Sequence, residues 1–413
     1  MPSNAKKYGV HRGQYCSILT WTAERCCQVR PTRVPLRVWP HAQGRSLLFP
    51  HPWSGFISHA WSVEPLTVAA YLTAIRAAER AAPPTSGGGG PKAASQARHW
   101  VVDVGANMGF FTLLGAALAP THQLLSVEMQ PLCTQIVRCA LQLNGIAPSS
   151  NNLTVLNHYV SGTHRGGGGR ANTSGILVPS RACDTMASPT AVGGRRPDGR
   201  LRGTMKNLNS SATIRVSPLA LGSYLLARVR APAERVSVVK VDVEGYEPLV
   251  VESLRPVWHL LDNVVIEVAP RSWQYHNLTF DEGVAPLREL VTSQGLRVLT
   301  LPKRRHGHGE KGRLASAELV DVCSRPAVSL NGTLRGQQAP SPHQQSSSPK
   351  SSRVATAAVS GLALLGAGIE GAVVFDQWAG MESLLRAVAR SSRADWPEFL
   401  LTRRLCVRHP TNV

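Results

Sequence analysis

Short apolar runs alternate with longer segments of helical periodicity in two blocks of the chain, residues 96–160 and 214–301. An apolar run bounded by polar residues predicts a strand, whereas apolar residues three and four apart predict one face of a helix. Strands rich in Val and Leu that alternate with helices are typical of a mostly parallel sheet covered on both faces. The sequence therefore predicts an α/β fold whose ligand binds beyond the carboxyl ends of the strands.

The predicted strands are His99–Val104, Gln123–Val127, Leu153–Val160, Val236–Val243, Val264–Val268 and Leu296–Leu301. The predicted helices are Pro65–Ala82, Phe110–Ala119, Leu132–Asn144, Tyr246–Leu254, Ala285–Gln294 and Met381–Ala389. A last apolar stretch follows at Phe399–Val407.

Composition divides the chain into four parts. Residues 1–95 are predicted to be an N-terminal extension with one helix and a glycine-rich linker. Residues 96–301 form the predicted core, which an insertion rich in Gly, Arg and Ser interrupts at 161–213. Residues 302–352 are a low-complexity linker, and 353–413 are expected to pack on the core or complete it. We expect the insertion and both ends of the chain to be disordered.

The most informative motif is the segment Val101–Thr112, in which a strand runs into a glycine turn and then into a helix. Gly105 lets the backbone turn sharply and approach a ligand, and Gly109 lets the start of the helix pack tightly. Glu128 ends the next strand, 25 residues after Asp103. A carboxylate there can accept hydrogen bonds from both hydroxyls of a ribose. The motif and the acid together predict a cofactor that contains a nucleoside.

The spacing of the glycines argues against a dinucleotide. The turn reads Gly-x-x-x-Gly, whereas close approach to a pyrophosphate uses Gly-x-Gly-x-x-Gly. Asp103, just before the turn, would repel a phosphate but could attract a cationic or amino-acid-bearing ligand. These features favour S-adenosylmethionine and disfavour a nicotinamide-dependent oxidoreductase.

A second cluster of charge follows the predicted strand Val236–Val243. Asp242 and Glu244 alternate with Val243, so we expect both carboxylates to project to one side, into the same crevice. Such a pair can hold an ammonium group, orient an acceptor hydroxyl or bind a divalent metal. The alternative is that these acids only stabilise the start of the next helix through its dipole.

Taken together, the motifs resemble those of the FkbM-type S-adenosylmethionine-dependent methyltransferases. The segments that carry the resemblance are Asp103–Gly109, Val127–Pro131, Asn144, Lys240–Glu247 and Val265–Val268. The resemblance covers about residues 98–301. It implies a class I methyltransferase (Rossmann-like) fold, with a mostly parallel seven-stranded sheet and helices on both faces. It also implies methyl transfer from S-adenosyl-L-methionine to a hydroxyl of a sugar, a glycan or another small molecule.

The resemblance also implies site residues in this chain. The cofactor contacts would be Asp103, Gly105, Ala106, Asn107, Gly109 and Glu128. Asp242 and Glu244 would lie at the reaction crevice, and we hypothesise that one of them removes the proton from the acceptor hydroxyl. We predict no metal ligands. The chain departs from the family pattern at Tyr159–Gly162 and at Leu219–Tyr224, which both lack an expected acidic residue.

Three further side chains near the predicted crevice have a simpler interpretation. Glu267 is a third candidate base, but it can equally bind the next backbone turn. We expect His276 to be a surface or core-edge histidine. Trp273 could line an acceptor pocket, although ordinary packing is the preferred interpretation.

Charge changes this picture little. The chain of 413 residues has 45 basic and 25 acidic residues, which gives a formal charge of +20. The excess lies in 1–60, 161–235 and 301–353, whereas residues 236–300 hold 5 basic and 9 acidic residues. A basic groove at the catalytic face is thus missing, and no specific nucleic-acid partner is expected. An RNA methyltransferase and a catalytically inactive methyltransferase-fold interaction module are the alternatives.

Cysteines and targeting signals leave the compartment open. The 8 cysteines form no CxxC pair, have no accompanying His cluster and do not resemble a disulfide framework. Glycosylation sequons point to the secretory pathway, at Asn152, Asn172, Asn209, Asn277 and Asn331. An arginine-rich, acid-poor start is typical of organelle import. The apolar run Val354–Ile369 has 16 residues, which is short for a membrane span. The oligomeric state also stays open.

Overall fold

The computed structural model of the chain describes its core and several flanking segments. These are residues 31–35, 46–50, 65–81, 99–147, 152–162, 176–179, 183, 213–229, 234–276, 278–301, 318–320, 374–375, 378–390, 397–403 and 406–408. Most of the low-complexity linker and much of the insertion lie outside these residues, as does the apolar run Val354–Ile369. The expectation of disorder therefore stays a prediction.

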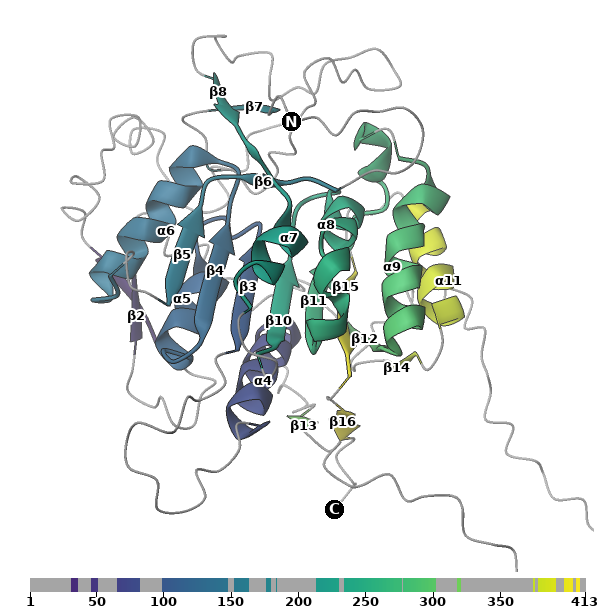
Figure 1. The fold of residues 1–413 in the computed structure, drawn as a ribbon, viewed down its shortest axis with the longest axis horizontal. Helices are drawn as coiled ribbons and strands as arrows, with labels where there is room; N and C mark the ends of the chain where they lie inside the picture. The colour runs from purple at the N-terminus through teal and green to yellow at the C-terminus, as the bar shows by residue number, and fades with distance from the viewer. Residues whose placement is uncertain are drawn as a thin grey trace, which may run out of the picture.

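A single large sheet forms the centre of the fold (Figure 1). Its strands are β3 (Trp100–Val104), β4 (Gln123–Val127), β5 (Leu153–Leu156), β10 (Val236–Val241), β11 (Asn263–Glu267), β12 (Arg297–Leu301), β14 (Val374–Phe375) and β15 (Glu398–Thr402). The order is β14-β12-β15-β11-β10-β3-β4-β5. From β11 to β5 all neighbours are parallel, whereas β15 is antiparallel to both β11 and β12.

This strand order confirms the predicted class I methyltransferase (Rossmann-like) fold. The strands that run parallel follow the doubly wound order 3-2-1-4-5-6, with β3 as the first and β10 as the fourth. The sheet has eight strands instead of the predicted seven, because the two-residue strand β14 pairs with the edge of β12. In such a sheet the order reverses between β3 and β10, which makes the carboxyl ends of these two strands the expected ligand site.

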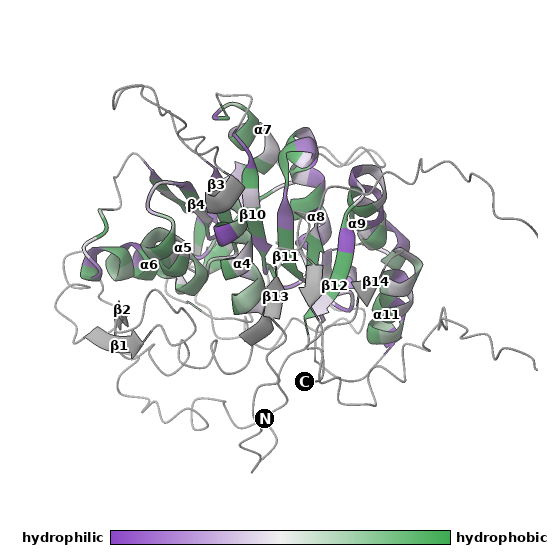
Figure 2. Ribbon diagram, turned by 90° about the horizontal axis from the view of Figure 1, so that it is seen from below, coloured by the Kyte–Doolittle hydropathy of each residue, from purple (hydrophilic) through white to green (hydrophobic). Residues whose placement is uncertain are grey.

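Helices cover both faces of the sheet. On one face lie α4 (Pro65–Ala81), α5 (Phe110–Leu118) and α6 (Pro131–Leu143). On the other lie α7 (Leu221–Leu226), α8 (Glu247–Ser253), the 3-10 helix η5 (Arg255–Leu260), α9 (Phe280–Gln294) and α11 (Trp378–Arg390). The pleat sends alternate residues to the two layers, so that Val101 contacts the first layer and Val102 the second. The central strands and the helix sides against them are accordingly hydrophobic (Figure 2).

Helix α4 belongs to the same core as the sheet. Its residues Tyr71 and Ile75 are fully buried, and Tyr71 donates a hydrogen bond of 3.1 Å to the carbonyl of Phe111 in α5. Thr67 of the same helix donates to the Glu398 carboxylate in β15. The N-terminal segment thus supplies part of one of the two layers that bury the sheet.

Four pairs of short strands lie outside the main sheet. They are β1 (Pro31–Pro35) with β2 (Ser46–Pro50), β6 (Tyr159–Val160) with β9 (Pro218–Leu219), β7 (Ile176–Pro179) with β8 (Thr213–Val216), and β13 (Glu318–Val320) with β16 (Cys406–Arg408). Of these, β7 lies inside the insertion that the sequence predicts to be disordered. That prediction is wrong for residues 176–179, which pair with β8 in an antiparallel ribbon.

Several predicted boundaries also differ, and for two of them a local contact accompanies the difference. The stretch Leu153–Val160 was expected to be one strand, but it divides into β5 and β6 because Asn157 turns towards the carbonyls of Glu128 and Met129. Helix α9 begins at Phe280 rather than at Ala285, since Thr279 and Glu282 form a capping box ahead of Pro286.

Among the helices in the described residues, none combines the length and the hydropathy needed for a bilayer crossing.

Candidate active site at the carboxyl ends of β3, β4 and β10

The glycine turn joins β3 to α5 and is held against the neighbouring strand. Gly105 and Gly109 have positive φ angles of 76° and 85°, and Asn107 between them has a φ of 49°. The amides of Gly105 and Ala106 donate hydrogen bonds of 2.9 and 3.2 Å to the carbonyl of Val127, the last residue of β4. The turn is therefore anchored to the end of the next strand, as a shared ligand site requires.

Packing leaves Gly105 no room for a side chain. A Cβ atom there would overlap the carbonyl of Asp242, which follows β10, and would lie 3.1 Å from a methyl group of Val243. The amide of Asp242 in turn donates to the carbonyl of Val104 at 3.1 Å. The glycine thus lets the loops after β3 and β10 touch, in addition to permitting the positive φ angle.

Asp103 is fully buried at the end of β3. Its Oδ2 atom accepts a hydrogen bond of 2.7 Å from the hydroxyl of Thr112 in α5, whereas its Oδ1 atom has no hydrogen-bond partner in the part of the chain that the structure describes. Burial raises the pKa of this carboxyl, and the positive charge of Lys240 acts in the opposite direction. Lys240 is the residue directly opposite Asp103 in the β10–β3 register.

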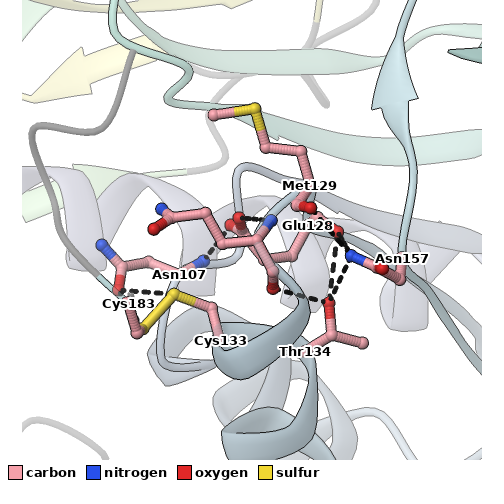
Figure 3. Close-up of a disulfide and its surroundings, with 8 residues drawn as sticks. Asn107, Glu128, Met129, Cys133, Thr134, Asn157 and Cys183 are labelled. Carbon is pink, nitrogen blue, oxygen red and sulfur yellow. Dashed lines mark hydrogen bonds between the residues drawn. A yellow bond between two sulfur atoms is a disulfide. The ribbon is translucent and has the colours of Figure 1, made fainter. Parts of the chain in front are cut away.

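Glu128, just after β4, connects the glycine turn to the loop before α6 (Figure 3). One of its carboxylate oxygens accepts from the amide of Asn107 at 2.8 Å, and the other accepts from the amide of Gln130 at 2.7 Å. Burial raises the pKa of Glu128 to about 7, the charges of Asp103 and Asp242 add to the effect, and the two amides oppose it. A carboxylate has further lone pairs with which to accept from a ligand hydroxyl.

Asn157 fixes the same loop from the side of β5. Its side-chain amide donates to the carbonyl of Glu128 at 3.0 Å and to the carbonyl of Met129 at 2.9 Å, and it contacts the hydroxyl of Thr134 (Figure 3). This asparagine sets the backbone of Glu128 and was not singled out from the sequence.

Asp242 and Glu244 lie in the loop that follows β10. Asp242 forms an ion pair of 2.7 Å with Lys240, whose side chain is 7% exposed against 29% for Asp242. The strand ends at Val241 and Glu244 has a φ of 55°. Alternation along a strand therefore does not apply to these two residues, and the expectation that both carboxylates project to one side stays a prediction.

Glu247 holds the rest of this loop in place. The carboxylate is fully buried and accepts from the amide of Gly245 at 2.6 Å, from the amide of Ala269 at 3.4 Å and from the indole of Trp273 at 3.1 Å. Burial raises the pKa of Glu247 to about 7, while these hydrogen bonds act in the opposite direction. Trp273 is fully buried, which agrees with its interpretation as a packing residue.

His276 lies against the loop that follows β10, whereas the sequence indicated only a surface or core-edge histidine. It belongs to the 3-10 helix η6 (Trp273–His276), and its ring packs against that of Tyr246 at an angle of 56°, with a centroid distance of 4.1 Å. A Cβ atom on Gly245 would lie 3.1 Å from its Nε2 atom. The third candidate base, Glu267, ends β11 opposite Glu398 of β15.

The departures from the family pattern have a physical reason at one position. A Cβ atom on Gly222 would overlap the carbonyl of Ser253 and lie 2.7 Å from Pro256, so an acidic side chain does not fit there. At Gly162 the added atom would lie 3.2 Å from the carbonyl of Leu249.

Asn144, which also carries the resemblance, accepts from the amide of Leu48 at 2.9 Å and donates to its carbonyl at 2.8 Å. These two hydrogen bonds hold β2 against the end of α6.

Sequence reasoning missed two features of the site. Lys240 was visible as a lone charge inside a run of valines, a pattern that indicates a buried charge in need of partners. The disulfide between Cys133 and Cys183 had no signal in the cysteine spacing.

Within the described residues, no three His, Cys, Asp or Glu side chains gather as a metal site.

No protein-family model matches the sequence, and no curated protein matches it. Among solved structures, a precorrin-6y C5,15-methyltransferase from Geobacter metallireducens GS-15 is 12% identical over 49% of this chain and 66% of its own, with a TM-score of 0.22. The methyltransferase FkbM from Methylobacillus flagellatus KT is 11% identical over 61% and 58%, with a TM-score of 0.28. The human methyltransferase 10 domain containing protein is 14% identical over 58% and 78%, with a TM-score of 0.25.

The chain thus spans less than two thirds of the first two of these structures. At these identities and TM-scores the matches add no argument of their own. The fold class rests on the strand order, and no residue, substrate or partner is carried over from these proteins.

The close contact at Gly105 predicts a large stability loss for Gly105→Ala. The matched control is Gly145→Ala, because Gly145 also has a positive φ angle, of 70°, but has nothing within 4 Å of an added Cβ atom. We expect Gly145→Ala to cost about 1–2 kcal/mol of unfolding free energy from backbone strain alone. Gly105→Ala should cost about 1–3 kcal/mol more, from overpacking. Urea denaturation measures both, and equal losses would contradict the contact.

The buried carboxyl of Glu247 predicts a pH-dependent stability. Its pKa is about 7 in the folded chain against an ordinary value of 4.5, so between these values the folded state binds a proton that the unfolded state has released. The unfolding free energy should therefore fall as the pH rises through this window, by up to about 1.4 kcal/mol per pH unit for one such group.

Denaturation curves across the window measure this slope. Glu247→Gln should reduce it, with Glu128 and Asp103 accounting for the part that is left. Glu289→Gln is the control, since Arg255 lowers the pKa of this exposed glutamate and places its titration below the window. An unchanged slope in Glu247→Gln would rule out the titration.

Proposed function

We propose that this protein is an S-adenosylmethionine-dependent methyltransferase of the FkbM type that methylates a hydroxyl group. The observation that carries the proposal is the charge at the carboxyl ends of the central strands. Besides burial, the charges of Asp103 and Asp242 raise the pKa of Glu128, and the charge of Asp242 raises the pKa of Asp103, so the three carboxylates lie close together. Lys240 forms an ion pair with Asp242, and its charge also acts on Asp103. Such a site favours a ligand with positive charge and disfavours a pyrophosphate.

The residues present fit this cofactor. The Oδ1 atom of Asp103 is a buried acceptor that lacks a donor from the described part of the chain, and a ligand ammonium could supply one. The carboxylate of Glu128 lies at the end of the second strand, where ribose hydroxyls bind in folds of this kind. The turn from Gly105 to Gly109, with Ala106 and Asn107, would pass against the cofactor. We assign these six residues to its binding.

When bound, S-adenosylmethionine supplies a methyl group on a positively charged sulfur, which is a strong electrophile. The protein then has to align an acceptor oxygen and accept its proton. Asp242 and Glu244 are the proposed bases, because both lie in the loop against the glycine turn. The ion pair with Lys240 fixes the position of Asp242. His276 is a further candidate beside Glu267, since it packs against Gly245 of the same loop.

The proposed acceptor is a sugar, a glycan or another small molecule with free hydroxyl groups. Residues 236–300, which form the second half of the site, hold 5 basic and 9 acidic residues. A net negative charge of this kind disfavours a phosphate backbone, so RNA is the less favoured acceptor.

Isothermal titration of the full chain with S-adenosylhomocysteine tests cofactor binding. We expect binding to the wild-type protein and a loss of about 10- to 100-fold in affinity for Glu128→Gln, since a hydrogen bond to a charged group contributes roughly 1.5–3 kcal/mol. Glu289→Gln, an exposed glutamate far from the site in sequence, should bind like the wild type. A folded wild-type protein, checked by circular dichroism, that binds no S-adenosylhomocysteine would contradict the proposal.

Methyl transfer tests the proposed bases. With a tritiated methyl donor and a panel of monosaccharides and oligosaccharides, the wild type should label an acceptor. Asp242→Asn or Glu244→Gln should lower kcat by about 10²- to 10⁴-fold, the usual contribution of general-base catalysis. If both variants keep the wild-type rate, neither acid is the base, and His276→Gln becomes the variant to measure.

A further inference from the structure

A disulfide joins the insertion to the helix that follows the cofactor loop. Cys133 lies in the first turn of α6, and Cys183 lies in the insertion, 50 residues further along the chain. Their Cα atoms are 5.0 Å apart. The insertion is therefore attached covalently to the core at this point, in addition to the pairing of β7 with β8.

The disulfide lies directly on the glycine turn (Figure 3). The side-chain oxygen of Asn107 is 3.9 Å from the sulfur of Cys133 and 3.6 Å from that of Cys183. Cys183 also packs against a small apolar cluster of Met108, Leu132 and Ile136, of which Met108 belongs to the same turn. Two successive residues of the turn are thus covered by the disulfide and its neighbours.

The covered residues are those on which the proposed cofactor site depends. Asn107 is a non-glycine residue with a φ of 49°, a conformation that surrounding contacts must maintain. Its amide is the donor that holds one oxygen of Glu128. A shift of Asn107 would therefore move both the turn and the acid proposed to bind the ribose.

We infer that the disulfide makes residue 183 of the insertion a wall of the cofactor site, and that the affinity for the cofactor depends on the disulfide being formed. The inference rests on the proposed function for its binding readout. It assigns the insertion a positioning role that its low-complexity sequence does not suggest. It also makes the enzyme responsive to the thiol–disulfide state of its surroundings.

The redox step is ordinary thiol–disulfide exchange. A thiolate of one cysteine attacks a low-molecular-weight disulfide such as oxidised glutathione and releases one thiol. The second cysteine then attacks the mixed disulfide, which forms the Cys133–Cys183 bond and releases the second thiol. Two electrons pass from the protein thiols to the small disulfide, and a dithiol such as dithiothreitol reverses the reaction.

The test compares the full chain oxidised with glutathione disulfide and reduced with dithiothreitol. The first readout needs no cofactor: amide hydrogen exchange of the turn, residues 105–109, should accelerate at least about tenfold on reduction. Helix α9, residues 280–294, lies on the opposite face of the sheet and should keep its exchange rate. The second readout is titration with S-adenosylhomocysteine, whose dissociation constant should rise at least about tenfold on reduction.

Variants separate the disulfide from general effects of the reductant. The double variant Cys133→Ser/Cys183→Ser should bind as the reduced wild type does and should not respond to dithiothreitol. Cys139→Ala changes a buried cysteine of the same helix that lies outside the disulfide, so it should keep the full response. A thermal melt of each sample shows that it is folded at the temperature of titration.

Three results would overturn the inference. One is alkylation of both Cys133 and Cys183 in protein that has been treated with glutathione disulfide. Another is an exchange rate at 105–109 that is the same in oxidised and reduced protein. The third is an equal dissociation constant in both states, even if reduction lowers the melting temperature. Oxidised protein that binds no S-adenosylhomocysteine would instead contradict the methyltransferase proposal, and the exchange rates would still decide the role of the disulfide.

Discussion

Lys240 is a buried cation whose need for partners organises the centre of this protein. A charged group removed from water costs several kcal/mol unless opposite charges surround it. Asp242 provides the ion pair, and Asp103 on the adjacent strand provides a second negative charge. The ends of β3 and β10 are thereby held together. The turn after β3 then lies so close to the loop after β10 that its first residue has no room for a side chain. Gly105 meets that requirement.

The same constraint explains why so much of the site can be predicted from the sequence. A run of valines interrupted by a lysine and ended by acids has few structural solutions, and the strand at Gln123–Val127 has the bounds that its pattern predicts. Local patterns show where the strands end and where the turns begin, and they thereby place the main residues of the site. These residues are Asp103, Gly105, Asn107 and Glu128. Because the strands are parallel, their carboxyl ends lie at the same edge of the sheet, where these residues contact one another.

What the sequence could not predict depends on contacts between distant residues. The break between β5 and β6 exists because Asn157 binds carbonyls of Glu128 and Met129, which a local pattern does not contain. The positive φ of Glu244 ends the strand alternation that its neighbours suggest. The disulfide pairs two cysteines that are 50 residues apart, and one of them lies in a segment without apolar periodicity. In each case the tertiary fold brings the contacting residue into place, so the local sequence pattern does not reveal the contact.

The position of β15 has a consequence for how the protein folds. Residues 398–402 fill the gap between β11 and β12, and Glu398 also contacts Thr67, 331 residues earlier. A ribosome must therefore translate the chain as far as residue 402 before the sheet can close. Until then β11 and β12 present unpaired edges, which are templates for pairing with other chains. Contacts of such long sequence separation slow folding, and a partly folded chain that exposes strand edges is prone to aggregate.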